Sequence, residues 1–183
     1  IIHIANGEYS GVNNTNITLA KDMSIVGQSS AGTIINGTNT NWIFNILPGV
    51  DVKLSNLTLT NGYTTTTGGG ICNQGSVTLT GCTIMDCSAI EYGGGIYSKG
   101  NCIITDCNIT RNKQTGTLDT FASGGIINDG GNCTITRSDI TYNTANANAG
   151  GIATQNGNCT ITDCEILYNY ANHGAGIVNY GGN

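Results

Sequence analysis

Residues 68–85 have the sequence GGGICNQGSVTLTGCTIM, and residues 93–110 repeat its pattern as GGGIYSKGNCIITDCNIT. In each copy a Gly-Gly-Gly-Ile marker precedes an apolar–polar–apolar stretch, two polar or Gly residues, and a second alternating stretch. Period-two alternation predicts short β-strands with one buried face, and the intervening pair predicts a corner. Each unit therefore contains two strands around a bend and a third strand at the Gly-Ile marker.

The unit recurs along the chain. Its marker Ile residues are separated by 25, 30, 26 and 25 residues and are Ile71, Ile96, Ile126, Ile152 and Ile177. One unit cannot bury its apolar face, but stacked copies can. The sequence predicts an all-β fold, a right-handed parallel β-helix (solenoid) with three short strands and about 25 residues per rung. Its handedness follows from the right-handed crossover rule.

We expect a single β-helix domain over residues 1–183. Residues 1–62 supply strands without the Gly-rich marker and form irregular N-terminal rungs, whereas residues 63–183 form the regular repeats. The last segment, VNYGGN at 178–183, resembles INDGGN at 127–132, which leads directly into another strand. The array is therefore expected to continue in a longer parent chain.

The composition argues against two classes of protein. Only 9% of the 183 residues are charged and the formal net charge is −5, whereas a typical soluble domain has about 25% charged residues. With 6 Lys+Arg against 11 Asp+Glu, the chain has no basic surface for nucleic acid. No apolar run reaches the ~18 residues that span a bilayer, so we expect no membrane insertion of this segment.

The repeats resemble those of the polymorphic-outer-membrane-protein type, which alternate a GGA[ILV]-like motif with an FxxN-like motif. The Gly-Ile markers correspond to the first motif; ITRN (109–112), ITYN (140–143) and ILYN (166–169) correspond to the second. Ile replaces the bacterial Phe, and IMDC (84–87) lacks the Asn. The N-terminal stretch contains IANGEYSG (4–11), ITLAKDMSIVGQS (17–29), TIINGTNTNWIF (33–44) and LSNLTLTNG (54–62). These segments resemble a recurring entry segment of the adhesin-like surface proteins of methanogenic archaea, and the departures from the bacterial motif favour this second resemblance.

The resemblance implies an extracellular, cell-surface protein. Our leading hypothesis is a non-catalytic adhesin-like module that attaches a cell to glycans or to surface proteins of another cell, without a cofactor. A passive structural stalk of a larger surface protein is the alternative.

Two groups of residues are candidates for binding. Arg111, Tyr142 and Tyr168 occupy one column after the second strand, and a basic–aromatic stripe suits sugar rings. The loop between Asn112 and Gly124 is about five residues longer than its counterparts. It carries the apolar residues Leu118 and Phe121, which either pack back onto the solenoid or form a contact point.

One corner column carries alternating charge on successive rungs. Asp106, Arg137 and Asp163 place a cation between two anions at strand spacing. We interpret this column as a structural ladder with little effect on stability.

Six of the 8 cysteines fall in predicted inward columns. They are either small core hydrophobes with free thiols or disulfide partners between rungs, and parallel side chains favour free thiols. The CxxxxC spacing is not typical of a metal site, and His3 and His173 lie far apart, so no metal site is predicted.

Two further functions rest on outward columns. Asp139 and Glu165 are neighbours in one column, at a spacing that suits a retaining glycosidase of polysaccharides. No third group supports them, so we predict no catalytic residues, and a polysaccharide lyase or glycoside hydrolase stays a further alternative function. Thr80, Thr105, Thr136 and Thr162 form a ladder that an ice-binding solenoid would also carry, although β-propensity explains it equally well.

Overall fold

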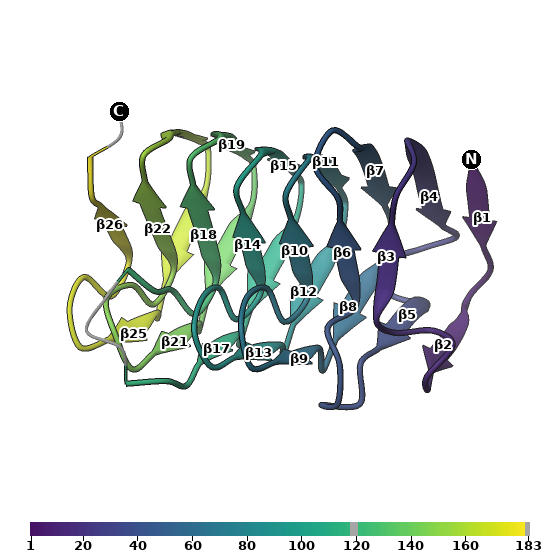
Figure 1. The fold of residues 1–183 in the computed structure, drawn as a ribbon, viewed down its shortest axis with the longest axis horizontal. Coiled ribbons are helices and arrows are strands. Elements are labelled where there is room, and N and C mark those ends of the chain that lie inside the picture. Colours follow the sequence, from purple (N-terminus) through teal and green to yellow (C-terminus); the bar gives the residue numbers. More distant parts are fainter. Residues whose placement is uncertain (118–120, 182–183) are drawn as a thin grey trace.

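The computed structural model describes residues 1–117 and 121–181, and these residues form no helix, so none that could cross a membrane. They form 26 short strands in four parallel sheets, A to D. The strands coil into a solenoid of about seven turns, roughly 26 residues each. Figure 1 shows the rungs side by side along one axis, with the two ends of the chain at opposite ends. The predicted β-solenoid is confirmed.

Sheet A is built from the first strand of each repeat. Its strands are β1 (Ile2–Ile4), β4 (Met23–Gly27), β7 (Asp51–Ser55), β11 (Ser76–Thr80), β15 (Asn101–Thr105), β19 (Asn132–Thr136) and β23 (Asn158–Thr162). The register is that of the sequence columns: Leu79 pairs with Leu54 on one side and Ile104 on the other. These side chains are buried because alternate residues of a strand face the interior.

Sheet B is built from the second strand of each repeat, beyond the corner. Its strands are β2 (Gly7–Ser10), β5 (Thr33–Asn36), β8 (Thr58–Thr60), β12 (Thr83–Met85), β16 (Asn108–Thr110), β20 (Asp139–Thr141) and β24 (Glu165–Leu167). Ile84, Ile109 and Ile140 are register partners and are fully buried.

Sheet C contains the marker strands. Its strands are β3 (Ile17–Leu19), β6 (Phe44–Ile46), β10 (Ile71–Asn73), β14 (Ile96–Ser98), β18 (Ile126–Asp129), β22 (Ile152–Gln155) and β26 (Ile177–Asn179). The glycines before each marker Ile allow rungs to approach closely. A Cβ on Gly94 would lie 2.5 Å from the carbonyl oxygen of Lys113, and one on Gly95 would lie 2.8 Å from that of Gly125. A larger residue would therefore displace the neighbouring rung.

Sheet D is a fourth ladder, additional to the three predicted strands per rung. Its strands are β9 (Tyr63–Thr64), β13 (Ser88–Ala89), β17 (Lys113–Gln114), β21 (Thr144–Ala145) and β25 (Tyr170–Ala171). It begins where the regular repeats begin, so the rungs of residues 1–62 have three sheets and the later rungs have four. Strands of two residues are too short to show alternation in the sequence.

A buried asparagine ladder closes the corner between sheets B and D. Asn143 Nδ2 donates to the carbonyl oxygen of Ile109 at 2.8 Å, and Asn143 Oδ1 accepts from the backbone N–H of Asn112 at 2.9 Å. Asn169 Nδ2 donates in the same way to the Ile140 carbonyl, at 2.7 Å. The Asn of each FxxN-like motif therefore pairs backbone groups that the corner leaves without partners.

Two corner columns have left-handed backbone conformations. The column between sheets A and B has φ between 44° and 61° and comprises Asn56, Gly81, Asp106, Arg137 and Asp163. The column between sheets B and D has φ between 54° and 57° and comprises Asn61, Asp86, Arg111, Tyr142 and Tyr168. Asn, Asp and Gly tolerate this region, whereas Arg and Tyr adopt it at a cost. The backbone turn therefore sets where these side chains project.

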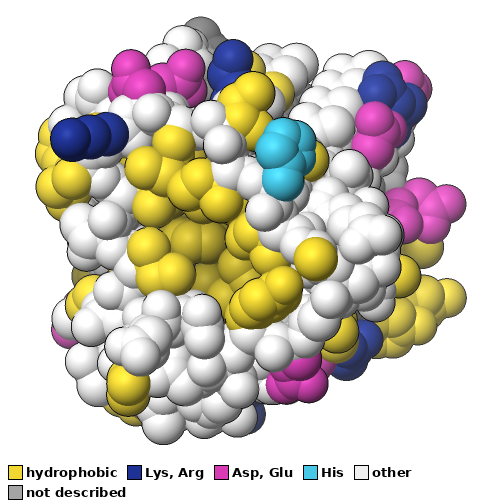
Figure 2. Space-filling model, turned by 90° about the vertical axis from the view of Figure 1, so that its right-hand side faces the viewer, with side chains coloured by type: hydrophobic (Ala, Val, Ile, Leu, Met, Phe, Trp, Pro, Cys, Tyr) yellow, Lys and Arg dark blue, Asp and Glu magenta, His cyan; other side chains and the backbone are white. Residues whose placement is uncertain are grey.

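Figure 2 views the N-terminal end of the solenoid and shows hydrophobic side chains gathered around a hollow. This hollow has a volume of about 610 Å³ and is lined by core residues that include Leu19, Ile25, Ile35 and Phe44.

Candidate functional site

The outer face of sheet C carries a group of aromatic side chains that lies outside the main core. The floor of this face is one line of outward residues on successive rungs: Cys72, Tyr97, Ile127, Ala153 and Val178. Of these, Cys72, Tyr97, Ile127 and Ala153 belong to a buried cluster separate from the solenoid interior, and Val178 packs against it. Side chains from outside sheet C, among them Tyr92 and Phe121, therefore cover its outer face.

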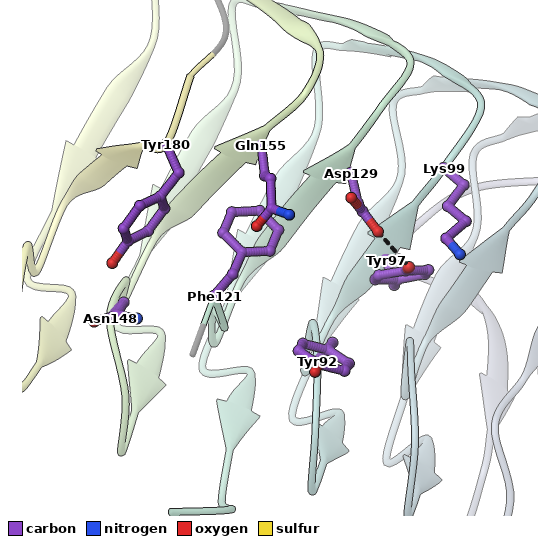
Figure 3. Close-up of a pocket in the computed structure, with 8 residues that line it drawn as sticks. All are labelled: Tyr92, Tyr97, Lys99, Phe121, Asp129, Asn148, Gln155 and Tyr180. Atoms are coloured by element: carbon purple, nitrogen blue, oxygen red, sulfur yellow. Dashed lines mark hydrogen bonds between the residues drawn. The ribbon is translucent and has the colours of Figure 1, made fainter. Parts of the chain in front are cut away.

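Two walls rise beside this floor. The polar wall lies two residues further along the marker strands, and its members on successive rungs are Gln74, Lys99, Asp129, Gln155 and Tyr180. The loop wall is formed by the loops that enter each marker and carries Tyr92, Phe121 and Asn148. The two walls and Tyr97 of the floor enclose an open groove of about 620 Å³, lined by Tyr92, Tyr97, Lys99, Phe121, Asp129, Asn148, Gln155 and Tyr180. Figure 3 shows the two walls as two rows of side chains with Tyr97 between them.

Tyr97 and Asp129 form the polar contact at the centre of the groove. The Tyr97 hydroxyl donates to Asp129 Oδ2 at 2.7 Å, and Tyr97 is only 7% exposed. Burial raises the pKa of the Tyr97 phenol above its ordinary value, and the hydrogen bond to the Asp129 carboxylate raises it further. The phenol therefore stays protonated at neutral pH and orients the carboxylate.

The four aromatic rings form two pairs. The rings of Tyr92 and Tyr97 lie 6.2 Å apart at an angle of 39°, and those of Phe121 and Tyr180 lie 5.7 Å apart, edge to face. These distances are typical of favourable aromatic contacts, which fix the orientation of each ring. The groove thus presents oriented rings beside the amides of Asn148 and Gln155.

This arrangement suits binding better than hydrolysis. Aromatic rings pack against the apolar faces of sugar rings, and amide and carboxylate groups bond hydroxyls. Glycoside hydrolysis requires two carboxyl groups flanking one bond, but Asp129 is the only acidic residue among the described residues that line the groove. The described part of the chain also contains no cluster of three His, Cys, Asp or Glu that could hold a metal ion.

The structure divides the predicted binding residues between two places. Phe121 lies in the groove, whereas Arg111, Tyr142 and Tyr168 project from the corner between sheets B and D. Leu118 lies outside the described residues. The predicted column is present, but it does not meet the loop that carries Phe121. Tyr92, Tyr97 and Tyr180 were not predicted from the sequence, although the outward position of Tyr97, one residue after a buried marker Ile, was a usable signal.

The side chains of the stripe already have contact partners. The rings of Tyr142 and Tyr168 stack at 5.0 Å and 18°, with exposed fractions of 54% and 71%. Arg111 donates two hydrogen bonds to the Asp86 carboxylate, of 2.8 Å from Nε and 2.9 Å from Nη2, and this contact raises the pKa of the guanidinium. Part of each stacked ring and the guanidinium fork are therefore already occupied.

The charged column has the predicted order but an uneven geometry. Arg137 donates to both carboxylate oxygens of Asp106, at 2.8 and 2.9 Å, and this contact lowers the pKa of Asp106. Asp163 acts on Arg137 through its charge. Both partners are at least half exposed, so the pair has little influence on stability.

The other outward columns also fall in register. Asp139 is the register partner of Glu165 on the adjacent strand of sheet B, and both residues are exposed. The threonine ladder is continuous on sheet A from Thr80 through Thr105 and Thr136 to Thr162. Neither column borders the groove on sheet C.

All eight cysteines are free thiols in the structure, and six of them are buried. Burial raises the pKa of the Cys87 thiol to about 12 and also raises that of Cys72. These thiols therefore stay neutral at physiological pH and act as small apolar side chains.

No protein-family model, curated protein or solved structure matches this chain.

Proposed function

We propose that this chain is a non-catalytic, glycan-binding β-solenoid module of an adhesin-like cell-surface protein. The observation that carries the proposal is the groove on sheet C, where four aromatic rings and a row of amide and charged groups line one elongated hollow. Sugars are amphipathic, with apolar ring faces and polar edges. A groove with rings beside hydrogen-bonding groups matches both.

The scaffold is suited to display. Each rung is held to the next by parallel strand pairing in at least three sheets, so the solenoid is a rod with side chains at fixed spacing. The low charge and the resemblance of the repeats to those of surface proteins support an extracellular location. Attachment through glycans is the adhesive role that this groove supports best.

Binding of purified protein to a glycan array, followed by titration calorimetry of the positive glycans, tests the proposal. We expect saturable binding that Tyr92→Ala and Tyr180→Ala each weaken by about tenfold, or roughly 1.4 kcal/mol. Tyr168→Ala is the matched control because Tyr168 is an exposed tyrosine outside the groove. It should leave affinity unchanged.

The variants should first be shown to be folded monomers by circular dichroism and size exclusion. If folded wild-type protein binds no glycan, the proposal is wrong and the passive-stalk hypothesis is favoured. If Tyr168→Ala abolishes binding and the groove variants do not, the site is the stripe of Arg111, Tyr142 and Tyr168.

A further inference from the structure

The groove continues beyond the hollow described above. A second hollow, of about 180 Å³, is lined by Trp42, Asn45, Thr67, Cys72 and Gln74. Cys72 is the register partner of Tyr97 on the floor, and Thr67 forms a bridge with Tyr92 on the loop wall. The two hollows therefore share the same floor and walls, one rung apart.

The second hollow repeats the chemistry of the first. It has one aromatic side chain, Trp42, and two amides, with Gln74 Nε2 donating to Asn45 Oδ1 at 3.4 Å. Gln74 is exposed and precedes Lys99 in the polar wall. A ligand that contacts aromatic rings and amides in the first hollow would meet the same kinds of group in the second hollow if it continued along the axis.

The spacing of the groups is set by the rungs. Parallel strands lie ~4.8 Å apart, which is close to the length of one pyranose unit in an extended chain. From β6 to β26 the groove passes six marker strands, a path of about 24 Å. A linear polysaccharide lying along the axis would thus meet a new set of wall residues with each sugar.

The charges indicate a neutral chain. Lys99 is the only cation among the described groove residues, and Asp129 on the next rung carries the opposite charge. Arg111 and Arg137 lie away from the groove, each bound to an aspartate. A polyanion requires a surplus of cations along its path, which this face lacks.

We propose that the groove binds a neutral linear polysaccharide parallel to the solenoid axis, with the hollow at Trp42 as an additional subsite. The inference rests on the proposed glycan-binding function and adds the class and orientation of the ligand.

Length dependence of binding tests this inference. The probes are cello- and chito-oligosaccharides from disaccharide to hexasaccharide, with oligogalacturonates of equal length as the anionic comparison. We expect affinity for one neutral series to rise by at least about tenfold from disaccharide to hexasaccharide, and the anionic series to bind far more weakly.

The variant Gln74→Ala locates the additional subsite. It should weaken binding of the hexasaccharide several-fold and leave binding of the disaccharide unchanged. Disaccharide binding by the same variant is therefore the control. Trp42→Phe, which keeps an aromatic ring, should retain more hexasaccharide affinity than Trp42→Ala. Melting temperatures confirm that the variants are folded.

The outcomes separate this inference from the proposed function. Equal affinity for disaccharide and hexasaccharide, or tighter binding of oligogalacturonate, overturns the inference while leaving glycan binding intact. Failure of all three series to bind overturns the inference, and the proposed function is overturned as well only if the glycan array is also negative. Loss of disaccharide affinity in Gln74→Ala also overturns the placement of the subsite.

Discussion

The Tyr97 phenol on β14 donates a 2.7 Å hydrogen bond to Asp129 Oδ2 on the next rung, β18. This bond joins the floor of the groove to its polar wall. It is also partly shielded from water because Tyr97 is nearly buried beneath the loop wall. The pair therefore contributes to the shape of the groove and to the stability of the fold.

Tyr97→Phe tests the stability contribution. Hydrogen bonds to charged groups contribute about 1.5–3 kcal/mol, so we expect the variant to lose roughly 1.5 kcal/mol of unfolding free energy. The measurement is urea unfolding at neutral pH, with Tyr168→Phe as an exposed control that should change stability by less than ~0.5 kcal/mol. An equal effect of the two variants would show that the Tyr97–Asp129 bond adds nothing.

Asn143→Ala tests the asparagine ladder. The change leaves the Ile109 carbonyl and the Asn112 N–H without their partners in a buried corner. Each unsatisfied group costs about 1–3 kcal/mol, and we expect a total loss of roughly 3 kcal/mol. Asn146→Ala is the control, because Asn146 is an exposed asparagine that also donates to a backbone carbonyl, that of Thr115. A loss below ~1 kcal/mol for Asn143→Ala would contradict the role of the ladder.

Cys87 occupies the ladder position of the preceding rung, where the FxxN-like motif lacks its Asn. Its Sγ accepts the Gly62 N–H at 3.4 Å, and its own N–H donates to Asn112 Oδ1 at 3.0 Å. Cys87→Asn should extend the ladder and keep or raise the melting temperature. Cys87→Ala, which removes the acceptor for Gly62, should lower it. A lower melting temperature for Cys87→Asn than for Cys87→Ala would show that the corner cannot hold the amide.

The raised pKa of the Cys87 thiol predicts the pH dependence of stability. An unfolded cysteine titrates near pH ~8.5, whereas burial raises the pKa of Cys87 to about 12 in the folded chain. Between these values the unfolded chain has lost a proton that the folded chain keeps. The stabilisation is complete below the unfolded pKa and is lost as pH rises toward 12.

Urea unfolding from pH 8 to pH 11 measures this loss. Wild-type stability should fall with pH, and Cys87→Asn should fall less steeply because one buried thiol is removed. Identical slopes for the two proteins would contradict the assignment.

The interior of the fold was predictable because one apolar period governs every rung. The columns of Leu54, Leu79 and Ile104 follow from residue type alone, and register partners confirm them. Sheet D was missed because its two-residue strands carry no alternation. In a solenoid the repeated apolar positions determine how successive rungs pair, whereas backbone conformation and contacts with neighbouring rungs determine the short corners.

The groove was harder to predict because its aromatic residues do not share one column. Tyr97 lies on the floor, Tyr180 on the polar wall, and Tyr92 and Phe121 on loops of different length. Column alignment groups residues at equal repeat positions, so it identified the stripe of Arg111, Tyr142 and Tyr168 instead. Phe121 was found for a different reason, as an apolar residue that a short exposed loop does not need.

A double-mutant cycle on Tyr142 and Tyr168 tests whether the stripe is structural. Their rings stack at 5.0 Å across adjacent rungs, and both residues hold left-handed corner conformations that tyrosine adopts at a cost. Stacked aromatic pairs contribute about 0.5–1.5 kcal/mol beyond burial, and we expect a coupling energy near the lower end because the pair is exposed. Urea unfolding of the two single alanine variants and the double variant gives this value. A coupling energy of zero, together with weaker glycan binding by the double variant, would instead make the stripe a second binding surface, because rings that do not stabilise one another are free to stack on a sugar.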